Sequence, residues 1–246
     1  MSLRGTCLIT YLPMRSEPRP GAEMVNSIIF GESYTIIEEQ EKWLKVLTDF
    51  DHYTGWINKA AHSEEQKFTE INDALYLDCI ENMRHLFVPC GANIPSGNTV
   101  EIRGLQYHIN RKLKTNHHLP LRIRIQKTAQ FFLNTPYLWG GRTFMGIDCS
   151  GFTQIVYKAN GYTLPRDTSQ QIKVGREVSF ENRQSCDLVF FSALDADHVS
   201  HVGIITDSGE VIHAGCVVRY NELTSEGLIV DDKLAYRLLG IRRIME

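Results

Sequence analysis

Residues 148–161 read DCSGFTQIVYKANG, and this stretch decides the fold of the C-terminal half of the chain. Its apolar side chains recur at intervals of three and four residues, at Phe152, Ile155, Val156 and Ala159. This spacing predicts an amphipathic helix, and the pair Asn160-Gly161 predicts where it ends.

Asp148 has the side chain of a good N-cap, which places Cys149 in the first turn of this helix. Backbone N–H groups and the helix dipole favour an anion there, so the sequence predicts a thiol whose pKa is lowered from about 8.5. Cys149 is therefore a candidate nucleophile. The alternative is a buried structural cysteine at a helix start, and the capping role explains Asp148 without any substrate.

The surrounding segments predict an α+β arrangement. Upstream, apolar residues between Ile123 and Leu133 fit a helix that Asn134-Thr135-Pro136 ends. Downstream come four apolar runs of strand length: Asp187–Phe191, Val202–Thr206, Val211–His213 and Ile241–Ile244. Because helices precede strands without regular alternation, an antiparallel sheet is favoured over a parallel, doubly wound one.

Two histidines flank a predicted hairpin, HVGIITDSGEVIHAG, at residues 201–215. A thiolate nucleophile needs an imidazole within hydrogen-bond reach and a third group that orients it. If Asp207-Ser208-Gly209 forms a three-residue loop, Gly203 lies opposite His213, and His201 shares a face with His213. A loop of two or four residues would send the histidines to opposite faces.

These histidines could also be metal ligands or ordinary core and surface residues. His198 with His201, and His213 with Cys216, resemble two ligand pairs. Residues i and i+3 of a strand face opposite sides, so such pairs chelate a metal only where the backbone turns. No metal site is therefore expected.

The N-terminal half predicts small all-β units. Strand-like runs separated by turn formers occupy Thr6–Leu12, Ser33–Glu38, Trp43–Leu47 and Gly55–Ile57. Strand-like runs separated by turn formers occur again at Asp73–Cys79, His85–Val88 and Thr99–Ile102. Such patterning predicts a small barrel followed by a second β unit.

The composition excludes several classes of protein. The 246 residues carry a net charge of −3, which gives no global field for nucleic acid, and the basic stretch 103–127 is interpreted as a solvated linker and helix face. No run approaches the roughly 18 apolar residues of a membrane helix. The N-terminal segment does not resemble a signal peptide, and the six cysteines contain no C-x-x-C pair. We therefore expect a cytoplasmic protein without a disulfide framework.

Six blocks occur in one order between residues 120 and 246: Tyr137-x-Trp139-Gly140-Gly141, Asp148–Phe152, Leu164-Pro165-Arg166, Asp187–Phe191, His201–Ile204 and Ile212-His213-Ala214. This order resembles the NlpC family of peptidoglycan-peptide cysteine peptidases. The resemblance implies a papain-like α+β catalytic domain over 119–246, with Cys149 as nucleophile, His201 as general base and His213 as the group that orients it. Cys186 departs from the family, which usually has glycine before the Asp-Leu-Val-Phe-Phe strand.

The N-terminal half resembles bacterial SH3-type domains, most clearly at Trp43–Val46 and Tyr53–Ile57. This implies two small all-β SH3-like barrels, over 1–62 and, with a linker, over 63–118. Tandem barrels before this catalytic domain resemble the γ-D-glutamyl-L-diamino acid endopeptidases. The resemblance carries their amine-binding residues onto Glu23 and Tyr53, and it implies that the first barrel closes one end of the cleft. Otherwise Glu23 is a solvated charge and Tyr53 a barrel-surface aromatic.

The same resemblance implies a substrate cleft lined by Tyr137, Trp139, Asp148, Ser150, Arg166 and Thr168. Tyr137 and Trp139 could equally be core aromatics. The implied reaction is hydrolysis, without a cofactor, of the γ-D-glutamyl-L-diamino acid bond in free murein peptides such as L-Ala-γ-D-Glu-L-Lys or its diaminopimelate counterpart. The alternatives are a cell-wall or peptide-binding module with a vestigial catalytic domain, and a related Cys-His amidase or acyltransferase.

Overall fold

The computed structural model describes residues 3–81, 84–110 and 118–245. The chain forms two compact units: Met1–His118 with Trp139–Phe144, and Leu119–Leu138 with Met145–Glu246. The predicted linker residues 111–117 lie outside the described residues. The domain boundaries at 62 and 118 stay predictions.

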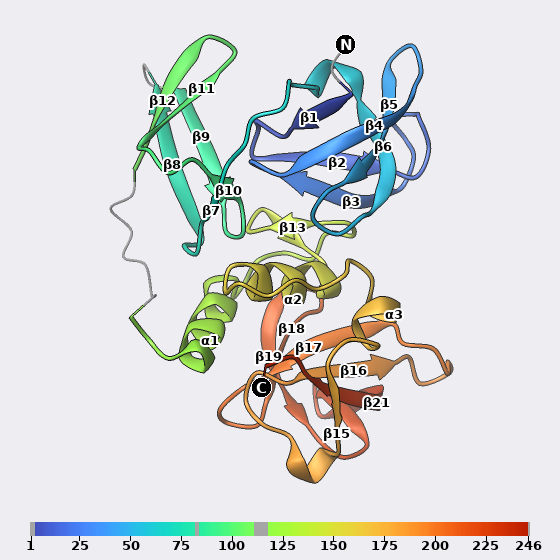
Figure 1. The fold of residues 1–246 in the computed structure, drawn as a ribbon. Helices are drawn as coiled ribbons and strands as arrows, with labels where there is room; N and C mark the ends of the chain where they lie inside the picture. Colours follow the sequence, from blue (N-terminus) through green and yellow to red (C-terminus); the bar gives the residue numbers. More distant parts are fainter. Residues whose placement is uncertain (1–2, 82–83, 111–117, 246) are drawn as a thin grey trace. The chain divides into compact units, whose positions relative to one another are not determined.

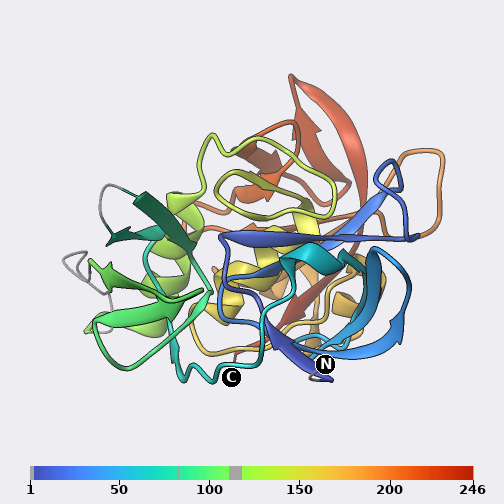
Figure 2. The same cartoon turned by 90° about the horizontal axis from the view of Figure 1, so that it is seen from above.

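The first unit begins with a curled antiparallel sheet (Figures 1 and 2). Within the described residues it has six strands: β1 (Arg4–Thr6), β2 (Tyr11–Arg15), β3 (Met24–Ile29), β4 (Ser33–Glu39), β5 (Trp43–Thr48) and β6 (Thr54–Asn58), followed by the short helix η1 (Lys59–Ala61). Their order is β1-β4-β5-β6-β2-β3. Buried residues alternate with half-buried ones along β5, so Leu44 and Val46 enter a core shared with Met14 and Ile28.

The predicted strand Thr6–Leu12 is wrong, because the chain turns within it. Its first residue ends β1, which pairs with β4, and its last two residues belong to β2, which pairs with β3. At the turn the Cys7 N–H donates to the Glu32 carbonyl at 2.9 Å. The sequence pattern does not predict β3, because this strand places the polar residues Asn26 and Ser27 at buried positions.

A second β region follows in the same unit. Its strands are β7 (Glu70–Ile71), β8 (Tyr76–Glu81), β9 (Arg84–Pro89), β10 (Asn93–Ile94), β11 (Thr99–Ile102) and β12 (Leu105–Ile109). Strands β11, β12, β8 and β9 lie side by side in this order, and β10 pairs with β7. The predicted strands match β8, β9 and β11 approximately, whereas β12 is not predicted. That this region is a second SH3-like barrel stays a prediction.

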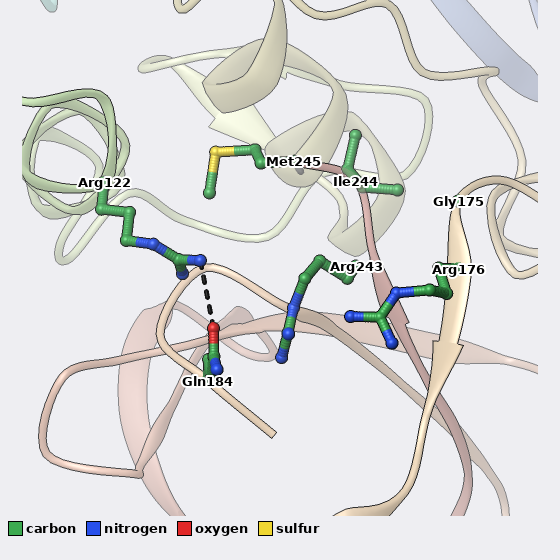
Figure 3. A pocket seen from close by; sticks show the side chains of 7 residues that line it. All are labelled: Arg122, Gly175, Arg176, Gln184, Arg243, Ile244 and Met245. Carbon is green, nitrogen blue, oxygen red and sulfur yellow. Dashed lines mark hydrogen bonds between the residues drawn. The ribbon is translucent and has the colours of Figure 1, made fainter. Parts of the chain in front are cut away.

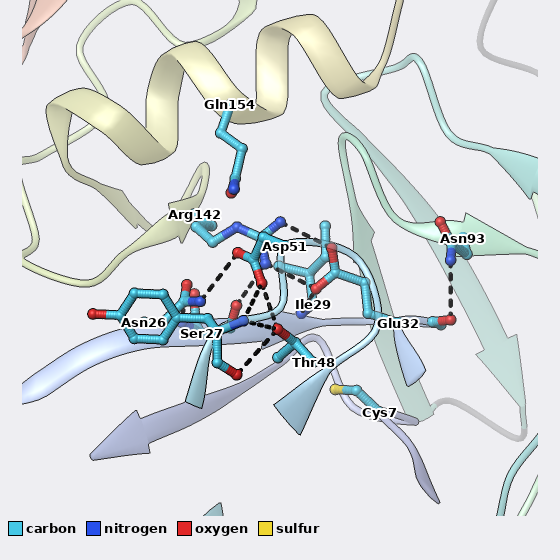
Figure 4. A network of polar contacts seen from close by, with 12 residues as sticks. Cys7, Asn26, Ser27, Ile29, Glu32, Thr48, Asp51, Asn93, Arg142 and Gln154 are labelled. Carbon is cyan, nitrogen blue, oxygen red and sulfur yellow. Dashed lines mark hydrogen bonds and ion pairs between the residues drawn. The ribbon is translucent and has the colours of Figure 1, made fainter. Parts of the chain in front are cut away.

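A buried ion pair fixes the segment Trp139–Phe144 within the first unit (Figure 4). Arg142, on the short strand β13 (Arg142–Thr143), donates to both carboxylate oxygens of Glu32 at 2.8 and 2.9 Å. It also donates to the Ser27 carbonyl at 2.8 Å. Arg142 is 1% exposed and Glu32 is 2% exposed, so each charge depends on the other rather than on water.

The second unit begins with its helices. They are α1 (Leu121–Phe131), α2 (Cys149–Lys158) and the short α3 (Thr168–Gln171). Both predicted helices are therefore confirmed. Helix α1 buries Ile125 and Ala129, whereas Ile123 is exposed, and every residue of α2 is buried. None of the helices in the described ranges is long and apolar enough to cross a membrane.

The rest of the second unit consists mainly of strands: β14 (Gly146–Ile147), β15 (Arg176–Val178), β16 (Leu188–Ser192), β17 (His201–Ile205), β18 (Val211–Ala214), β19 (Val218–Leu223), β20 (Gly227–Val230) and β21 (Lys233–Arg243), with the short helix η2 (Phe180–Asn182) after β15. In the described part of the chain, seven of them form a sheet in the order β15-β21-β16-β17-β18-β19-β20. Neighbours are antiparallel, as predicted, and β20 also pairs with β21, so the strands from β16 to β21 close on themselves.

The sequence pattern predicts only the buried part of this sheet. Strands β16, β17 and β18 are buried throughout and coincide with predicted apolar runs. The predicted strand Ile241–Ile244 covers only the end of β21, and β15, β19 and β20 are not predicted. Charged and polar residues interrupt β15 and β19, so these two strands lack a continuous apolar run, whereas β20 is a short apolar run, GLIV.

Cys186 occupies a backbone conformation that favours glycine, with φ of 69°. Its N–H donates to the Ile205 carbonyl at 2.8 Å, and its carbonyl accepts from the Tyr157 hydroxyl. Its buried thiol accepts from the Gln126 amide at 3.3 Å. These contacts hold a non-glycine residue in the left-handed region, at a position where the resembled family usually has glycine.

Candidate active site

Cys149 is the first residue of α2, as predicted. Asp148 has extended backbone angles and accepts from the Gly151 N–H at 2.7 Å, so it caps the helix. Cys149 is 6% exposed. The backbone N–H groups of Val202 and Ser150 are directed at its thiol. The start of α2 and the strand β17 therefore meet at this sulfur atom.

Asp148, Ser150 and Arg166 form one buried polar cluster. Arg166 Nη1 donates to Asp148 Oδ1 at 3.0 Å and to Ser150 Oγ at 2.7 Å, and Nη2 donates to Asp148 Oδ2. All three residues are less than a tenth exposed. Three of the six predicted cleft residues are thus brought together, and the charge of Asp148 is compensated inside the unit by a bidentate arginine.

The predicted hairpin has the predicted register. Ile204 pairs with Ile212, and Thr206 N–H donates to the Glu210 carbonyl at 2.8 Å, which leaves a three-residue loop. A Cβ atom added to Gly203 would lie 3.0 Å from the His213 Cβ, so Gly203 lies against His213 as expected. His201 and His213 therefore share one face of the sheet.

A chain of hydrogen bonds connects these histidines to a third strand. His201 Nε2 lies 2.7 Å from His213 Nδ1, and His213 Nε2 lies 3.0 Å from Asn221 Oδ1. The Asn221 amide nitrogen donates to the Ile229 carbonyl at 2.9 Å. The amide orientation follows from this last bond, because a carbonyl can only accept.

The direction of each proton follows from the Asn221 end of the chain. Its amide oxygen can only accept, so His213 carries its proton on Nε2 and accepts at Nδ1. His201 must then donate from Nε2. A neutral His201 therefore has its lone pair on Nδ1, which is the atom able to take a proton from a thiol.

Asn221 is not among the residues predicted from the sequence. It lies on β19 opposite Val211, two residues before His213 on β18, and is therefore a diagonal neighbour of His213 on the same face. The strand parity that places His201 and His213 on one face also places Asn221 there, once the turn between β18 and β19 is known. No apolar run marks β19, so its register is not visible in the sequence.

Burial keeps both members of the candidate pair neutral. It raises the pKa of Cys149 to about 12, with the Asp148 carboxylate as the next cause. It lowers the pKa of His201 to about 3, with His213 as the next cause, and it also lowers the pKa of His213. The predicted lowering of the thiol pKa by the helix start is wrong, because desolvation outweighs it.

His201 is held by its neighbours and borders a cavity. Its ring stacks on Tyr236 at 4.8 Å between centroids and meets the His213 ring edge-on at 4.9 Å. The cavity has a volume of about 470 Å³ and is lined by Tyr137, Ser200, His201, Ala214, Gly215, Cys216 and Tyr236. A substrate carbonyl entering here would lie beside the candidate base.

The remaining predicted residues are distributed as follows. Tyr137 lines the cavity, and burial raises its hydroxyl pKa above the ordinary value, with the Cys149 thiol as the next cause. Thr168 begins α3 and is half-buried. Trp139 and Glu23 are exposed and Tyr53 is half-buried in the first unit. The substrate-binding roles of these residues stay predictions. No group of three or more His, Cys, Asp or Glu suited to a metal ion occurs among the described residues.

Known proteins resemble both halves of the chain. Residues 134–231 match the NlpC/P60 family, and residues 14–61 match the bacterial dipeptidyl-peptidase SH3 domain. The crystal structure of an NlpC/P60 family protein from Bacillus cereus covers 99% of this chain and 100% of its own, with a TM-score of 0.79 at 21% identity. At this identity the likeness concerns the fold.

Curated relatives agree with these matches at modest identity. The gamma-D-glutamyl-L-lysine dipeptidyl-peptidase of Bacillus cereus is 28% identical over 76% of this chain and 66% of its own length. The Bacillus subtilis protein of the same name is 42% identical over 37% of this chain and 31% of its own. Dipeptidyl-peptidase 6 of Lysinibacillus sphaericus is 28% identical over 92% of this chain and 94% of its own. The chain thus spans less than two thirds of the two Bacillus relatives.

These matches agree in order and position with the SH3-like expectation for the first barrel and with the resemblance that begins at Tyr137. The chain carries an NlpC/P60-family domain behind a bacterial dipeptidyl-peptidase SH3 domain.

Proposed function

We propose that this protein is a cysteine peptidase that hydrolyses the γ-D-glutamyl-L-diamino acid bond of free murein peptides with an N-terminal L-Ala. The observation that carries the proposal is the hydrogen-bonded order His201, His213 and Asn221, which leaves His201 Nδ1 unprotonated on the residue before Val202, whose backbone meets the Cys149 thiol. The names of the two Bacillus relatives, gamma-D-glutamyl-L-lysine dipeptidyl-peptidase, support the choice of bond.

The reaction follows from these groups. His201 Nδ1 takes the proton of the Cys149 thiol as the sulfur attacks the γ-amide carbonyl, which forms a tetrahedral oxyanion. Backbone N–H groups near the start of α2 stabilise this oxyanion. The imidazolium then protonates the leaving amine, and the thioester forms. Water, deprotonated by His201, attacks the thioester, releases the new γ-carboxylate and restores the thiol.

The resting pair is neutral rather than a thiolate–imidazolium ion pair. The raised pKa of Cys149 and the lowered pKa of His201 both favour the uncharged forms. Proton transfer therefore accompanies attack and does not precede it. The oxyanion and the imidazolium exist only in the tetrahedral species. Groups that stabilise these two charges therefore lower the barrier to attack without stabilising the resting pair.

Recognition of the N-terminal amine is assigned to Glu23 and Tyr53 together with Asp148. An ammonium group forms charge-assisted hydrogen bonds with carboxylates and a phenol. Because Arg166 already compensates Asp148, we assign most of the attraction to Glu23. A peptide whose amine is blocked, or still joined to glycan, would be a poor substrate.

Incubation with L-Ala-γ-D-Glu-L-Lys and mass-spectrometric detection of the products tests the proposal. We expect L-Ala-γ-D-Glu and free L-Lys, and no turnover by Cys149→Ala. Binding of the tripeptide without cleavage by the wild-type protein would favour a binding module instead. Release of a different fragment would favour an amidase, and transfer of the acyl group to an added amine in preference to water would favour an acyltransferase.

A further inference from the structure

A second cavity lies at the opposite end of the sheet from His201. Its volume is about 660 Å³, and it is lined by Arg122, Gly175, Arg176, Gln184, Arg243, Ile244 and Met245 (Figure 3). Along β16, Leu188 pairs with Arg242 next to this cavity, whereas Phe191 pairs with His201 at the other end. The cavity shares no lining residue with the one beside His201.

Three guanidinium groups converge on this cavity, and only one has a carboxylate partner among the described residues. Arg243 donates from Nε and Nη2 to Asp187 at 2.8 and 2.7 Å. Arg122 donates to the Ser185 carbonyl and to Gln184 Oε1, which are both uncharged. Arg176 pairs with Arg243 through the backbone of β15 and β21, but its exposed side chain has no hydrogen bond or ion pair to another described residue. Within residues 3–81, 84–110 and 118–245, the positive charges of Arg122 and Arg176 therefore have no carboxylate partner.

Such an arrangement is electrostatically unfavourable unless an anion is present. Like charges directed into one cavity repel each other, and the helix dipole adds positive potential because Arg122 lies in the first turn of α1. Ile244 and Met245 supply an apolar wall beside these charges, and Met245 is 4% exposed.

We propose that this cavity binds a phosphate group. The planar forks of several arginines match the oxygens of a phosphate, and a dianionic phosphate monoester balances the two uncompensated charges. A carboxylate would balance only one of them. The described residues that line the cavity include no cysteine, serine, histidine or acidic residue, and the proposal concerns binding alone. This proposal does not depend on the proposed peptidase activity.

Calorimetric titration of the full chain with inorganic phosphate at constant ionic strength tests the site. We expect saturable binding of one phosphate, weakened at least about tenfold in Arg176→Gln, which removes an exposed side chain without a structural partner. Lys173→Gln is the matched control, because it removes an exposed charge nearby that does not line the cavity. It should bind phosphate within about twofold of the wild type.

A second arm distinguishes the sources of the phosphate group. A glycerol phosphate monoester and a short poly(glycerol phosphate) are titrated in parallel. We expect the dianionic monoester to bind more tightly per phosphate group than the polymer, whose phosphodiesters carry one charge each, and tighter binding of the polymer would overturn the charge balance argued above. Absence of saturable phosphate binding, equal binding by Arg176→Gln, or equal weakening in the Lys173→Gln control would each overturn the proposal. Equal unfolding midpoints of the three proteins confirm that the comparison concerns binding.

Discussion

His213 Nε2 lies 3.0 Å from Asn221 Oδ1, and this contact determines where the proton sits on each imidazole of the site. Without an acceptor at residue 221, His213 could carry its proton on Nδ1 and would no longer accept from His201. The candidate base would then lose its favoured tautomer. Asn221 is thus a positioning residue that acts through His213.

Asn221→Leu should lower kcat/KM by about 100-fold, because the base is no longer held in its reactive tautomer. Asn221→Asp keeps an acceptor and should retain most activity at neutral pH. Its carboxylate raises the pKa of His213, and a protonated His213 cannot accept from His201. The acid limb of the pH–kcat/KM profile should therefore move to higher pH in Asn221→Asp. If Asn221 had only a structural role, Asn221→Asp would change the free energy of unfolding and leave the acid limb of the pH–kcat/KM profile in place.

Folding stability should fall steeply in acid because His201 is buried as a neutral group. Its pKa is about 3 in the folded chain and about 6.5 when unfolded, so between these values only the unfolded chain binds the proton. The contribution is fully present above pH 6.5 and is lost as the pH falls towards 3, up to about 4–5 kcal/mol. Urea unfolding of wild type and His201→Gln between pH 4 and 8 measures it. Parallel pH dependences of the two proteins would contradict the assignment.

Cys216, and not Cys149, should react first with iodoacetamide at pH 7. Cys216 is exposed, whereas Cys149 is buried with a pKa of about 12 and carries very little thiolate. Peptide mapping by mass spectrometry after short labelling times distinguishes the two. In Cys216→Ser, labelling of Cys149 should stay at least about tenfold slower than labelling of Cys216 in the wild type. Rapid labelling of Cys149 would show that the resting site holds a thiolate.

Arg142→Met should destabilise the protein by about 3–5 kcal/mol, because it leaves the Glu32 carboxylate buried without its cation. The double variant Arg142→Met with Glu32→Leu should recover much of this loss, since both charges are then removed. Chemical unfolding of the two single variants and the double variant measures the coupling. Additive effects would mean that the two side chains do not depend on each other.

The sequence predicts the features that depend on local periodicity. The start of α2 is visible from Asp148 and the apolar spacing after it, and the shared face of His201 and His213 follows from the parity of a three-residue loop. Both arguments use neighbours within about twelve residues, where the backbone geometry of a helix or hairpin is nearly fixed.

Features that depend on packing between distant segments are not visible in the sequence. Arg142 and Glu32 are 110 positions apart, and nothing local marks either as buried. The pKa of Cys149 depends on how completely the unit covers the thiol, which opposes the local effect of the helix start. Asn221 lies on a half-buried strand without an apolar run, so its alignment with His213 requires the register of the whole sheet.

The free amine of the substrate should matter to cleavage, and in the proposed mode of recognition most of this effect belongs to Glu23. Arg166 compensates Asp148, so N-acetylation would leave mainly Glu23 without a cation. We expect kcat/KM for L-Ala-γ-D-Glu-L-Lys to exceed that for its N-acetyl form by about 100-fold. Glu23→Gln should lower the rate with the free amine at least about tenfold and barely change the rate with the acetylated peptide, so the ratio shrinks. Glu41→Gln, which removes another exposed carboxylate of the first barrel, should leave the ratio unchanged. A wild-type ratio near one would show that the first barrel takes no part in recognising the amine, and the enzyme would then be a general cell-wall endopeptidase.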